Sequence, residues 1–473
     1  MRDLPPAASN AGEDRERHWA ARLRSAAWGL AVTLADLTPP GVRYGYVHPI
    51  ARRLLRRPLD HLTAVDGIAF SPPGRDRPTP PTDLRCGLVA DHLDVGGIGR
   101  VVEMLTEGLR SEGIEPVVVC PAEGSRSARL RSLGYEVVVA AADASARGLL
   151  ESARLDVVQL HSAPAQLVEA ALGTGAPAIP VLHNTEIHYA RPQWDATAAL
   201  FDRAHAVVAV SELVRRFHLE RVPASAGEKI LVVPNGAMTM PTATPEVRAR
   251  ARARLGATLD ASLDGCVVFA CLARYDSQKN IAGTVASFLD AVDGCAVPVR
   301  LVVAGDPSDW LEYHRADALR RGHRNGGAVH LLGNSDAATL LAASDAFLLN
   351  SYFEGWPLAT TEAVAAGLPI VVSDTGGATE LVSRAVEGST VIENPTGPAA
   401  AVSDRSARAA RRRAPAQRNR LALAEAVAAV GTIAAQRGEV RCPVDDSYDT
   451  MVAGHARVIR AARAQRRGDP DGR

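Results

Sequence analysis

Short apolar runs alternate with longer stretches of helical pattern through most of this chain, in two successive sets. The first set begins with the run from Arg85 to Ala90 and ends with the run from Ile230 to Val233. The second begins with Cys266 to Leu272 and continues to Ile370–Val372. Apolar runs that alternate with helices at this spacing predict parallel strands with helices on both faces of the sheet. The sequence therefore predicts an α/β fold built from two doubly wound, Rossmann-like domains.

The length of the chain supports the same division. The chain has 473 residues, and single hydrophobic cores rarely grow beyond about 250–300 residues. We expect an N-terminal extension over residues 1–83, a first domain over 84–245 and a second domain over 246–440. Residues 441–473 are predicted to form a C-terminal helix and a disordered tail, with the tail starting at Gln465.

The N-terminal extension carries a helical apolar stripe. Apolar residues recur there at steps of three and four: Trp19, Leu23, Ala27, Leu30, Leu34 and Leu37. An arginine-rich stretch from Arg52 to Arg57 and a Pro-rich connector from Ser71 to Thr82 follow. One interpretation is a helix packed on the domain that follows it, which we favour because the stripe is narrow and rich in alanine. The other is an amphipathic helix that docks on an anionic membrane surface or a partner.

Charge and cysteine content limit the class of protein. Lys plus Arg and Asp plus Glu both number 53, so the formal net charge is zero, which argues against a nucleic-acid binder. No Cys-x-x-Cys spacing occurs, so we expect buried thiols in a reducing compartment; the six cysteines are Cys86, Cys120, Cys266, Cys271, Cys295 and Cys442. No secretory leader is recognisable, and no apolar stretch approaches the ~18–20 residues of a membrane span. We therefore expect a cytoplasmic protein, with peripheral contact at the inner face of the membrane left open through the extension.

Two carboxylates stand close together after one of the predicted strands. Glu354 lies in the loop that follows the apolar run from Asp345 to Asn350, and Glu362 lies about two turns into the next helix. Pro357 suits the first turn of that helix and Gly367 its C-terminal exit. Open α/β sheets bind ligands at the carboxyl ends of their strands. Two carboxylates there suit a ligand rich in hydroxyl groups, because each can accept several hydrogen bonds.

Positive groups accompany these carboxylates at other strand ends. Arg274 and Lys279 share the loop after the first strand of the second domain, and Lys279 is one of only two lysines in the chain. A lysine ammonium is a compact phosphate-binding charge. Gly96 and Gly97 open a helix whose N-terminus can also face a phosphate. A dinucleotide-binding fingerprint does not fit this turn, because Val102 stands where its third glycine belongs.

The string from Glu354 to Gly377 resembles the signature of retaining GT-B glycosyltransferases of the family-4 type, also called glycosyl transferases group 1. In that signature a Glu-x7-Glu spacing precedes a Gly-Gly turn, and the resemblance extends over about Leu84 to Leu381. It implies a GT-B fold, with two Rossmann-like domains that face each other across a cleft. It also implies that the donor substrate contacts the following residues: Gly96, Gly97, Arg274, Lys279, Glu354, Gly355, Trp356, Pro357, Leu358 and Glu362.

The same resemblance implies individual roles. Glu354 would hold hydroxyls of the donor sugar, and Glu362 the ribose of the nucleotide. Arg274 and Lys279 would grip the donor phosphates, and His183 would lie near the reacting carbon. The catalytic residues expected on this basis are Glu354, His183, Arg274 and Lys279. His161, Asp91, His92 and Asn235 also follow strands and are further candidates, although no motif supports them.

The expected activity is retaining transfer of a hexose-type sugar from a nucleoside-diphosphate sugar to an acceptor hydroxyl. The acceptor is a cell-envelope glycan, a glycolipid or a natural product, and the sugar nucleotide serves as co-substrate without a further cofactor. We expect Arg274, Lys279 and helix N-termini, and no metal ion, to neutralise the charge of the donor diphosphate. The only Asp-x-Asp pair, which could hold a metal, is Asp469–Asp471 in the predicted tail. A nucleotide-sugar epimerase on the same two-domain plan and a non-catalytic nucleotide-sugar-binding protein remain alternatives. The nucleotide base, the acceptor and the oligomeric state stay open.

Overall fold

The computed structural model describes residues 23, 26–38, 42–55, 62–70, 80–91, 93–94, 96–141, 143, 145–238, 240, 243–436 and 446–468. Trp19, His92, Cys442 and the Asp469–Asp471 pair lie outside these residues, as does most of the Pro-rich connector.

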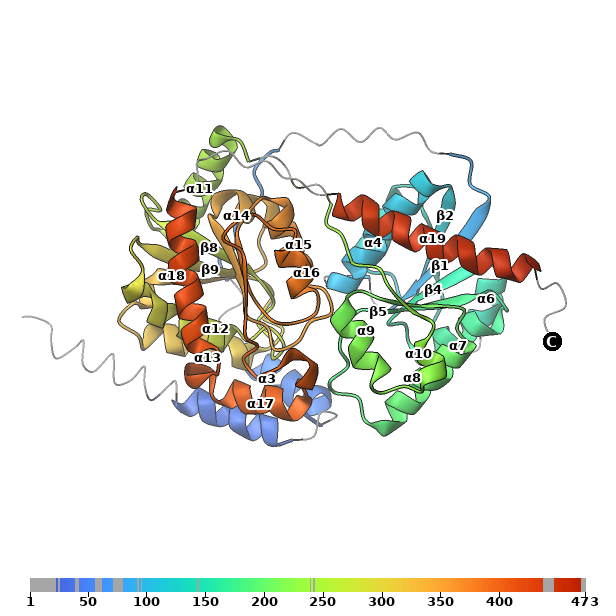
Figure 1. Ribbon diagram of the computed structural model, residues 1–473, viewed down its shortest axis with the longest axis horizontal. Coiled ribbons are helices and arrows are strands. Elements are labelled where there is room, and N and C mark those ends of the chain that lie inside the picture. The colour runs from blue at the N-terminus through green and yellow to red at the C-terminus, as the bar shows by residue number, and fades with distance from the viewer. Residues whose placement is uncertain are drawn as a thin grey trace, which may run out of the picture.

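The first domain contains a parallel sheet of seven strands within the described residues, in the order β3-β2-β1-β4-β5-β6-β7 (Figure 1). The strands are β1 (Leu84–Ala90), β2 (Ile114–Cys120), β3 (Glu136–Val139), β4 (Val157–His161), β5 (Ala178–Leu182), β6 (Val207–Ala209) and β7 (Ile230–Val232). The connecting helices are α4 (Gly97–Leu109), α5 (Ser125–Ser132), α6 (Ala146–Ser152), α7 (Ala165–Gly173), α8 (Arg191–Arg203), α9 (Glu212–Leu219) and α10 (Ala224–Gly227).

The second domain has a parallel sheet of six strands within the described residues, in the order β10-β9-β8-β11-β12-β13. Its strands are β8 (Val267–Leu272), β9 (Val299–Ala304), β10 (Val329–Leu332), β11 (Ala346–Leu349), β12 (Ile370–Ser373) and β13 (Thr390–Ile392). Its helices are α11 (Pro245–Leu259), α12 (Ile281–Ala291), α13 (Trp310–Arg321), α14 (Ala337–Ala343), α15 (Leu358–Ala365), α16 (Ala378–Val382), α17 (Asp404–Arg412) and α18 (Arg420–Gln436). The predicted α/β class with two doubly wound parallel sheets is confirmed.

The central strands are buried on both faces, as parallel strands covered by helices on either side must be. Every residue of β4, β11 and β12 is buried. Strand order reverses between β1 and β4 in the first sheet and between β8 and β11 in the second. Loops that leave the carboxyl ends of strands diverge at such reversals, and ligands bind there. The predicted site loops follow β1, β5, β8 and β11.

The C-terminal helix α19 (Ser447–Gly468) returns to the first domain and packs on α4 and β4 (Figure 1). The Tyr448 hydroxyl donates to the carbonyl of Met104 at 3.1 Å, and His455 Nδ1 lies 3.1 Å from the amide nitrogen of Gln159. The predicted start of a disordered tail at Gln465 was wrong, because the helix continues to Gly468.

The N-terminal segment packs on the second domain, so the expectation that it packs on the following domain was wrong. Helix 26–37 buries Val32 and Ala35 against Leu311 of α13, and the Trp28 ring stacks on His314 with centroids 4.7 Å apart. Helix α3 (His48–Leu55), preceded by the π-helical turn η1 (Arg43–Val47), also contacts α13. Residues 62–70 then run beside α14.

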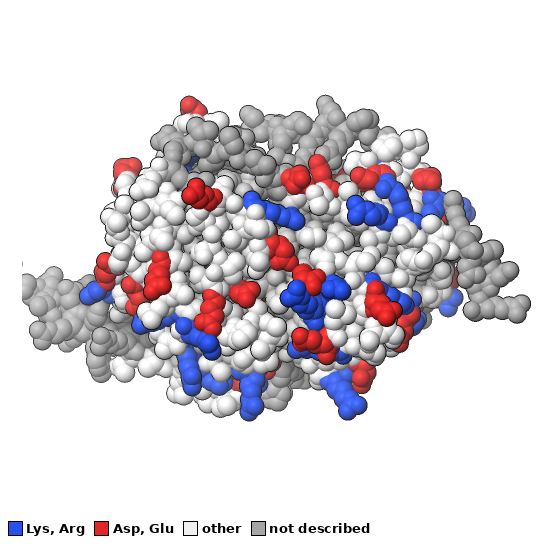
Figure 2. All heavy atoms as spheres, in the orientation of Figure 1, with Lys and Arg blue, Asp and Glu red and all other residues white. Residues whose placement is uncertain are grey.

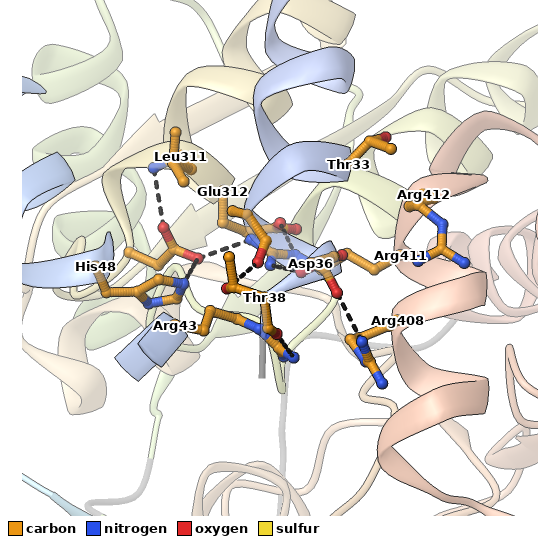
Figure 3. A network of polar contacts seen from close by, with 12 residues as sticks. Thr33, Asp36, Thr38, Arg43, His48, Leu311, Glu312, Arg408, Arg411 and Arg412 are labelled. Carbon is orange, nitrogen blue, oxygen red and sulfur yellow. Dashed lines mark hydrogen bonds and ion pairs between the residues drawn. The ribbon is translucent and has the colours of Figure 1, made fainter. Parts of the chain in front are cut away.

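A buried arginine ties this segment to the second domain (Figure 3). Arg411 of α17 reaches Asp36 at 2.9 Å, Asp309 at 2.8 Å and Glu312 at 3.3 Å. Burial by itself would lower the pKa of Arg411, but the three carboxylates outweigh burial and raise that pKa. Burial also raises the pKa of Glu312, against the opposing charge of Arg411. The guanidinium therefore supplies positive charge to three buried acids on two segments: Asp36 of helix 26–37, and Asp309 and Glu312 at the start of α13.

We expect Arg411→Met to destabilise the protein by about 3–5 kcal/mol, because it leaves buried carboxylates without their counter-charge. Thermal unfolding of the full chain measures the effect. Arg405→Met is a matched control, since Arg405 is exposed on the same helix and its loss should shift stability by less than about 0.5 kcal/mol. Equal stability of the two variants would contradict a structural role for the Arg411 cluster.

Candidate active site

A cleft of about 510 Å³ lies between the two domains, at the carboxyl ends of the strands. Loops from both domains line it. The structure brings every predicted site residue to this cleft: Gly96, Gly97, His183, Arg274, Lys279, Glu354, Gly355, Trp356, Pro357, Leu358 and Glu362. Their individual roles remain predictions.

The loop after β8 is held by its own side chains. The Asp276 carboxylate accepts hydrogen bonds from the backbone amides of Gln278 and Lys279, both at 3.0 Å. Asn280 ends the loop in a left-handed conformation, with φ 54°, and its side chain donates to the carbonyl of Asn350 at 2.9 Å. Asparagine tolerates this conformation better than most residues. The loop is therefore fixed relative to β11 before α12 begins.

Glu354 and Lys279 form an ion pair with each other. Lys279 Nζ lies 2.6 Å from Glu354 Oε1, and Gln278 Nε2 donates to Glu354 Oε2 at 3.1 Å. The Glu354 carboxylate is buried, so this pairing supplies the counter-charge that a buried carboxylate needs. Arg274 differs, because its side chain is about half exposed and pairs with Asp276 at 3.0 Å. The two predicted phosphate-binding cations thus have different surroundings.

Glu362 is a cleft carboxylate of a different kind. Among the described residues, its side chain has no hydrogen bond or ion pair. Burial raises the pKa of Glu362, while the charges of Arg100 and Arg126 in the first domain act in the opposite direction. A carboxyl group that lines a cleft without a protein partner keeps its capacity to accept hydrogen bonds from a ligand.

The two domains touch backbone to backbone at Gly355. A Cβ atom placed on Gly355 would lie 1.9 Å from the carbonyl oxygen of His183 and 2.9 Å from Cα of Asn184. Gly376, at φ 49°, also approaches Gly355 closely, since its Cβ would stand 2.4 Å from the Gly355 carbonyl oxygen. A Cβ on Gly377 would meet the Trp356 ring at 2.1 Å. The glycines of the motif are therefore required by close packing.

We expect Gly355→Ala to lower the predicted sugar-transfer activity by about 10²-fold or more, because the methyl group must push the His183 loop away from the cleft and misplace the reacting groups. Steady-state kinetics of the purified variant measures the loss. Gly294→Ala is the control, because a Cβ there meets no atom within 4 Å. Wild-type kinetics in Gly355→Ala would show that the inter-domain contact does not position the site.

His183 is paired with a second histidine behind it. His161 Nδ1, at the end of β4, lies 3.0 Å from His183 Nε2. Burial lowers the pKa of His183 to about 3 and that of His161 well below its usual value. His161 Nε2 is buried without a hydrogen-bond partner among the described residues. A buried N–H without an acceptor is the costlier arrangement, so we infer that His161 carries its proton on Nδ1 and donates it to His183.

This arrangement has a chemical consequence. Because Nε2 of His183 accepts from His161, neutral His183 carries its own proton on Nδ1. His183 can therefore donate a hydrogen bond to a ligand oxygen, but it supplies no positive charge near neutral pH. Sequence analysis placed His161 only at the end of a strand. In the structure its contact with His183 makes it a positioning residue for that histidine.

The lowered pKa values predict the pH dependence of stability. Unfolded histidines titrate near 6.5, whereas His161 and His183 stay neutral in the folded protein, so the unfolded state binds more protons below pH 6.5. Stability should accordingly fall as the pH drops from about 7 to 5. Imidazole NMR signals should show both rings neutral throughout that range. Protonation of His183 between pH 6 and 7 would contradict the paired, buried arrangement.

Arginines of the first domain complete the cleft and were missed by sequence analysis. Arg100 of α4 and Arg126 of α5 line the cleft. Both are held by the buried carboxylate of Glu103, at 2.8 Å and 2.5 Å, and Arg129 joins them at 2.5 Å. Burial tends to raise the pKa of Glu103, but the three arginines lower it overall. The sequence feature that could have revealed this arginine cluster is Glu103, a glutamate within the apolar stretch of α4.

The remaining candidate residues from the sequence differ in whether they line the cleft. Asn235 lines the cleft, whereas Asp91 does not, and His92 lies outside the described residues.

In the described ranges, no group of three or more His, Cys, Asp or Glu side chains could hold a metal ion. Metal-independent chemistry stays a prediction. Within the same ranges, none of the helices has the length and apolar character needed to cross a bilayer.

Comparison with known proteins identifies the family. Residues 263–420 match the model of the glycosyl transferases group 1, and residues 95–239 match the model of Glycosyltransferase Family 4. The chain belongs to the group 1 glycosyltransferases. The two matches cover the second and first α/β domains of the structure, respectively.

Curated relatives match only parts of this group 1 glycosyltransferase. Glycogen synthase of Mycobacterium tuberculosis is 33% identical over 183 residues, which is 36% of this chain and 42% of the relative. The N,N'-diacetylbacillosaminyl-diphospho-undecaprenol alpha-1,3-N-acetylgalactosaminyltransferase of Campylobacter jejuni is 51% identical over 65 residues, or 14% and 17% of the two chains. The chain thus spans less than half the length of these relatives.

Solved structures confirm the GT-B fold. Anabaena Alr3699/HepE, determined in complex with UDP-glucose, covers 80% of this chain and 100% of its own, with 18% identity and a TM-score of 0.55. A glycosyltransferase from Rickettsia africae covers 80% and 98%, with 15% identity and a TM-score of 0.58. At these identities the likeness concerns the fold alone.

Proposed function

We propose that this protein is a retaining glycosyltransferase that transfers a hexose-type sugar from a nucleoside-diphosphate sugar to an acceptor hydroxyl. One observation carries the proposal: a single inter-domain cleft contains Glu354, Glu362, Arg274 and Lys279 together with His183. The acids suit the hydroxyls of a sugar and a ribose, and the cations suit a diphosphate. The relative complexed with UDP-glucose shares the fold and supports a nucleotide-sugar donor.

The charges of the cleft suit departure of a diphosphate. Negative charge develops on the leaving phosphate as the bond to the sugar breaks, and preorganised cations stabilise it. Arg274 and Lys279 supply positive charge from the second domain, and Arg100 and Arg126 supply it from the first. Glu354, held by Lys279 and Gln278, would orient the sugar ring, while Glu362 would accept from the ribose hydroxyls.

His183 would contact the sugar from the opposite wall. As a neutral hydrogen-bond donor, it would bind a sugar hydroxyl near the reacting carbon without adding charge. The Gly355 contact holds the His183 loop against the sugar-binding loop, which would keep water away from the reacting carbon and limit hydrolysis. Retention, the hexose donor, metal independence and the cytoplasmic location belong to this proposal. The acceptor is a cell-envelope glycan, a glycolipid or a natural product.

We expect Glu354→Gln and Lys279→Met each to lower kcat by about 10²–10³-fold, because each removes one charge of the pair that orients and stabilises the reacting groups. Transfer from a panel of nucleotide sugars, with NMR assignment of the anomer formed, measures activity and retention. Lys229→Met is the matched control. Lys229 donates to three carbonyls at the end of α8, so its loss should lower stability and leave kcat near wild type.

The same experiments separate the alternatives. A thermal-shift panel identifies the donor, since a ligand at about 100 times its Kd adds about 2.7 kcal/mol of stability. An epimerised nucleotide sugar as sole product would select an epimerase. Binding of a nucleotide sugar with neither transfer nor hydrolysis would select a non-catalytic binding protein. An inverted anomer in the product would refute the retaining mechanism.

A further inference from the structure

Helix 26–37 has two apolar faces, and only one of them packs on the protein. Val32 and Ala35 are buried against α13. The leucines of the predicted stripe are exposed: Leu30, Leu34 and Leu37 lie on the other side of this helix, Leu23 precedes it, and all four are between 51% and 68% exposed. The stripe that we expected to pack on a domain therefore faces outward.

The neighbouring helices repeat this arrangement. Tyr46 of η1 and Ile50 and Leu54 of α3 recur at steps of four and are between 57% and 70% exposed. Val47 and Ala51 pack on the same buried cluster as Val32 and Ala35. Since both helical segments pack on one cluster, their opposite faces point away from the domain together. We call these seven side chains the apolar ridge: Leu23, Leu30, Leu34, Leu37, Tyr46, Ile50 and Leu54.

The surroundings of the apolar ridge are positive. Asp36 is the only acidic residue from Leu23 to Arg57, and it is buried against Arg411. Arg53 is exposed beside Leu54, and the sequence from Arg52 to Arg57 contains four arginines. Exposed arginines also line α17, which packs on helix 26–37 (Figures 1 and 2). No exposed carboxylate among the described residues of helix 26–37, η1 or α3 balances them.

We propose that the apolar ridge docks this protein on an anionic phospholipid surface. Apolar side chains on one face of a helix insert at the headgroup boundary, and basic residues beside them pair with anionic lipids. Isolated exposed apolar side chains are common, but seven of them along adjoining helical segments are typical of an interaction surface. No described residue of helix 26–37, η1 or α3 lines the cleft, so docking through the apolar ridge leaves the walls of the cleft uncovered.

Charge distinguishes a lipid surface from a second copy of the chain. A symmetric contact between two apolar ridges would bring arginines against arginines. The exposed residues of helix 26–37, η1 and α3 offer no acid to pair with them. Such like-charge contacts are costly. An anionic bilayer supplies both an apolar layer and the missing negative charge.

The test is vesicle co-sedimentation of the full chain. Binding to vesicles that contain phosphatidylglycerol should exceed binding to pure phosphatidylcholine vesicles by at least about tenfold and weaken with salt. The triple variant Leu30→Ser, Leu34→Ser, Ile50→Ser should lose at least about tenfold in partitioning, because it removes the apolar insertion. Arg53→Gln should lose about fivefold, since a lysine or arginine near an anionic surface contributes about that factor.

Leu421→Ser is the matched control, because Leu421 is 68% exposed on α18 of the same domain and lies outside the apolar ridge. Its vesicle binding should equal that of the wild type, and all variants should keep the wild-type unfolding temperature. Absence of wild-type binding, or equal binding by the triple variant, overturns the proposal. A wild-type dimer that becomes monomeric in the triple variant and does not bind vesicles would instead assign the surface to a second copy. None of these measurements depends on sugar transfer.

Discussion

The contact between Gly355 and the carbonyl of His183 is the constraint on which the site depends. It joins the loop after β11 to the loop after β5 without room for any side chain. Because the two loops belong to different domains, this approach sets the width of the cleft and the distance between its acidic and histidine walls. Two polar contacts reinforce it: Glu380 accepts from the backbone amide of Glu212 at 3.2 Å, and His188 Nδ1 lies 2.9 Å from Asp404.

The ends of the chain cross between the domains. Helix 26–37 and α3 precede the first domain in sequence yet pack on the second, where Arg411 holds Asp36. Helix α19 follows the second domain and packs on the first, where His455 reaches Gln159. Each domain is thus completed by a segment from the far end of the chain. The second domain gains the outward apolar ridge in this way, while its cleft face keeps the loops of the site.

Charges in the cleft are arranged in three ways that suit different tasks. Glu354 is paired with Lys279, whose ammonium group is the counter-charge of this buried carboxylate and holds it in place. Glu103 forms ion pairs with both Arg100 and Arg126. Because one carboxylate cannot neutralise two guanidinium groups, positive charge remains at the cleft. Glu362 has no pairing among the described residues and carries a pKa raised by burial. Burial of such an unpaired acid lowers the stability of the ligand-free protein. Hydroxyl groups of a ligand that donate hydrogen bonds to the acid offset this loss.

The sequence by itself determined the alternation of strands and helices, the two-sheet α/β class and the loops that carry Glu354, Lys279 and His183. These features are local, because strand period, turn residues and the rule that ligands bind at carboxyl ends all act over short stretches of chain. Only the tertiary structure decided that His161 supports His183, that Arg100 and Arg126 face the cleft, and that helix 26–37 packs by Val32 with its leucines outward. Helical spacing reveals both apolar faces of that helix, but which face is buried depends on α13 and Arg411, hundreds of residues away in the chain.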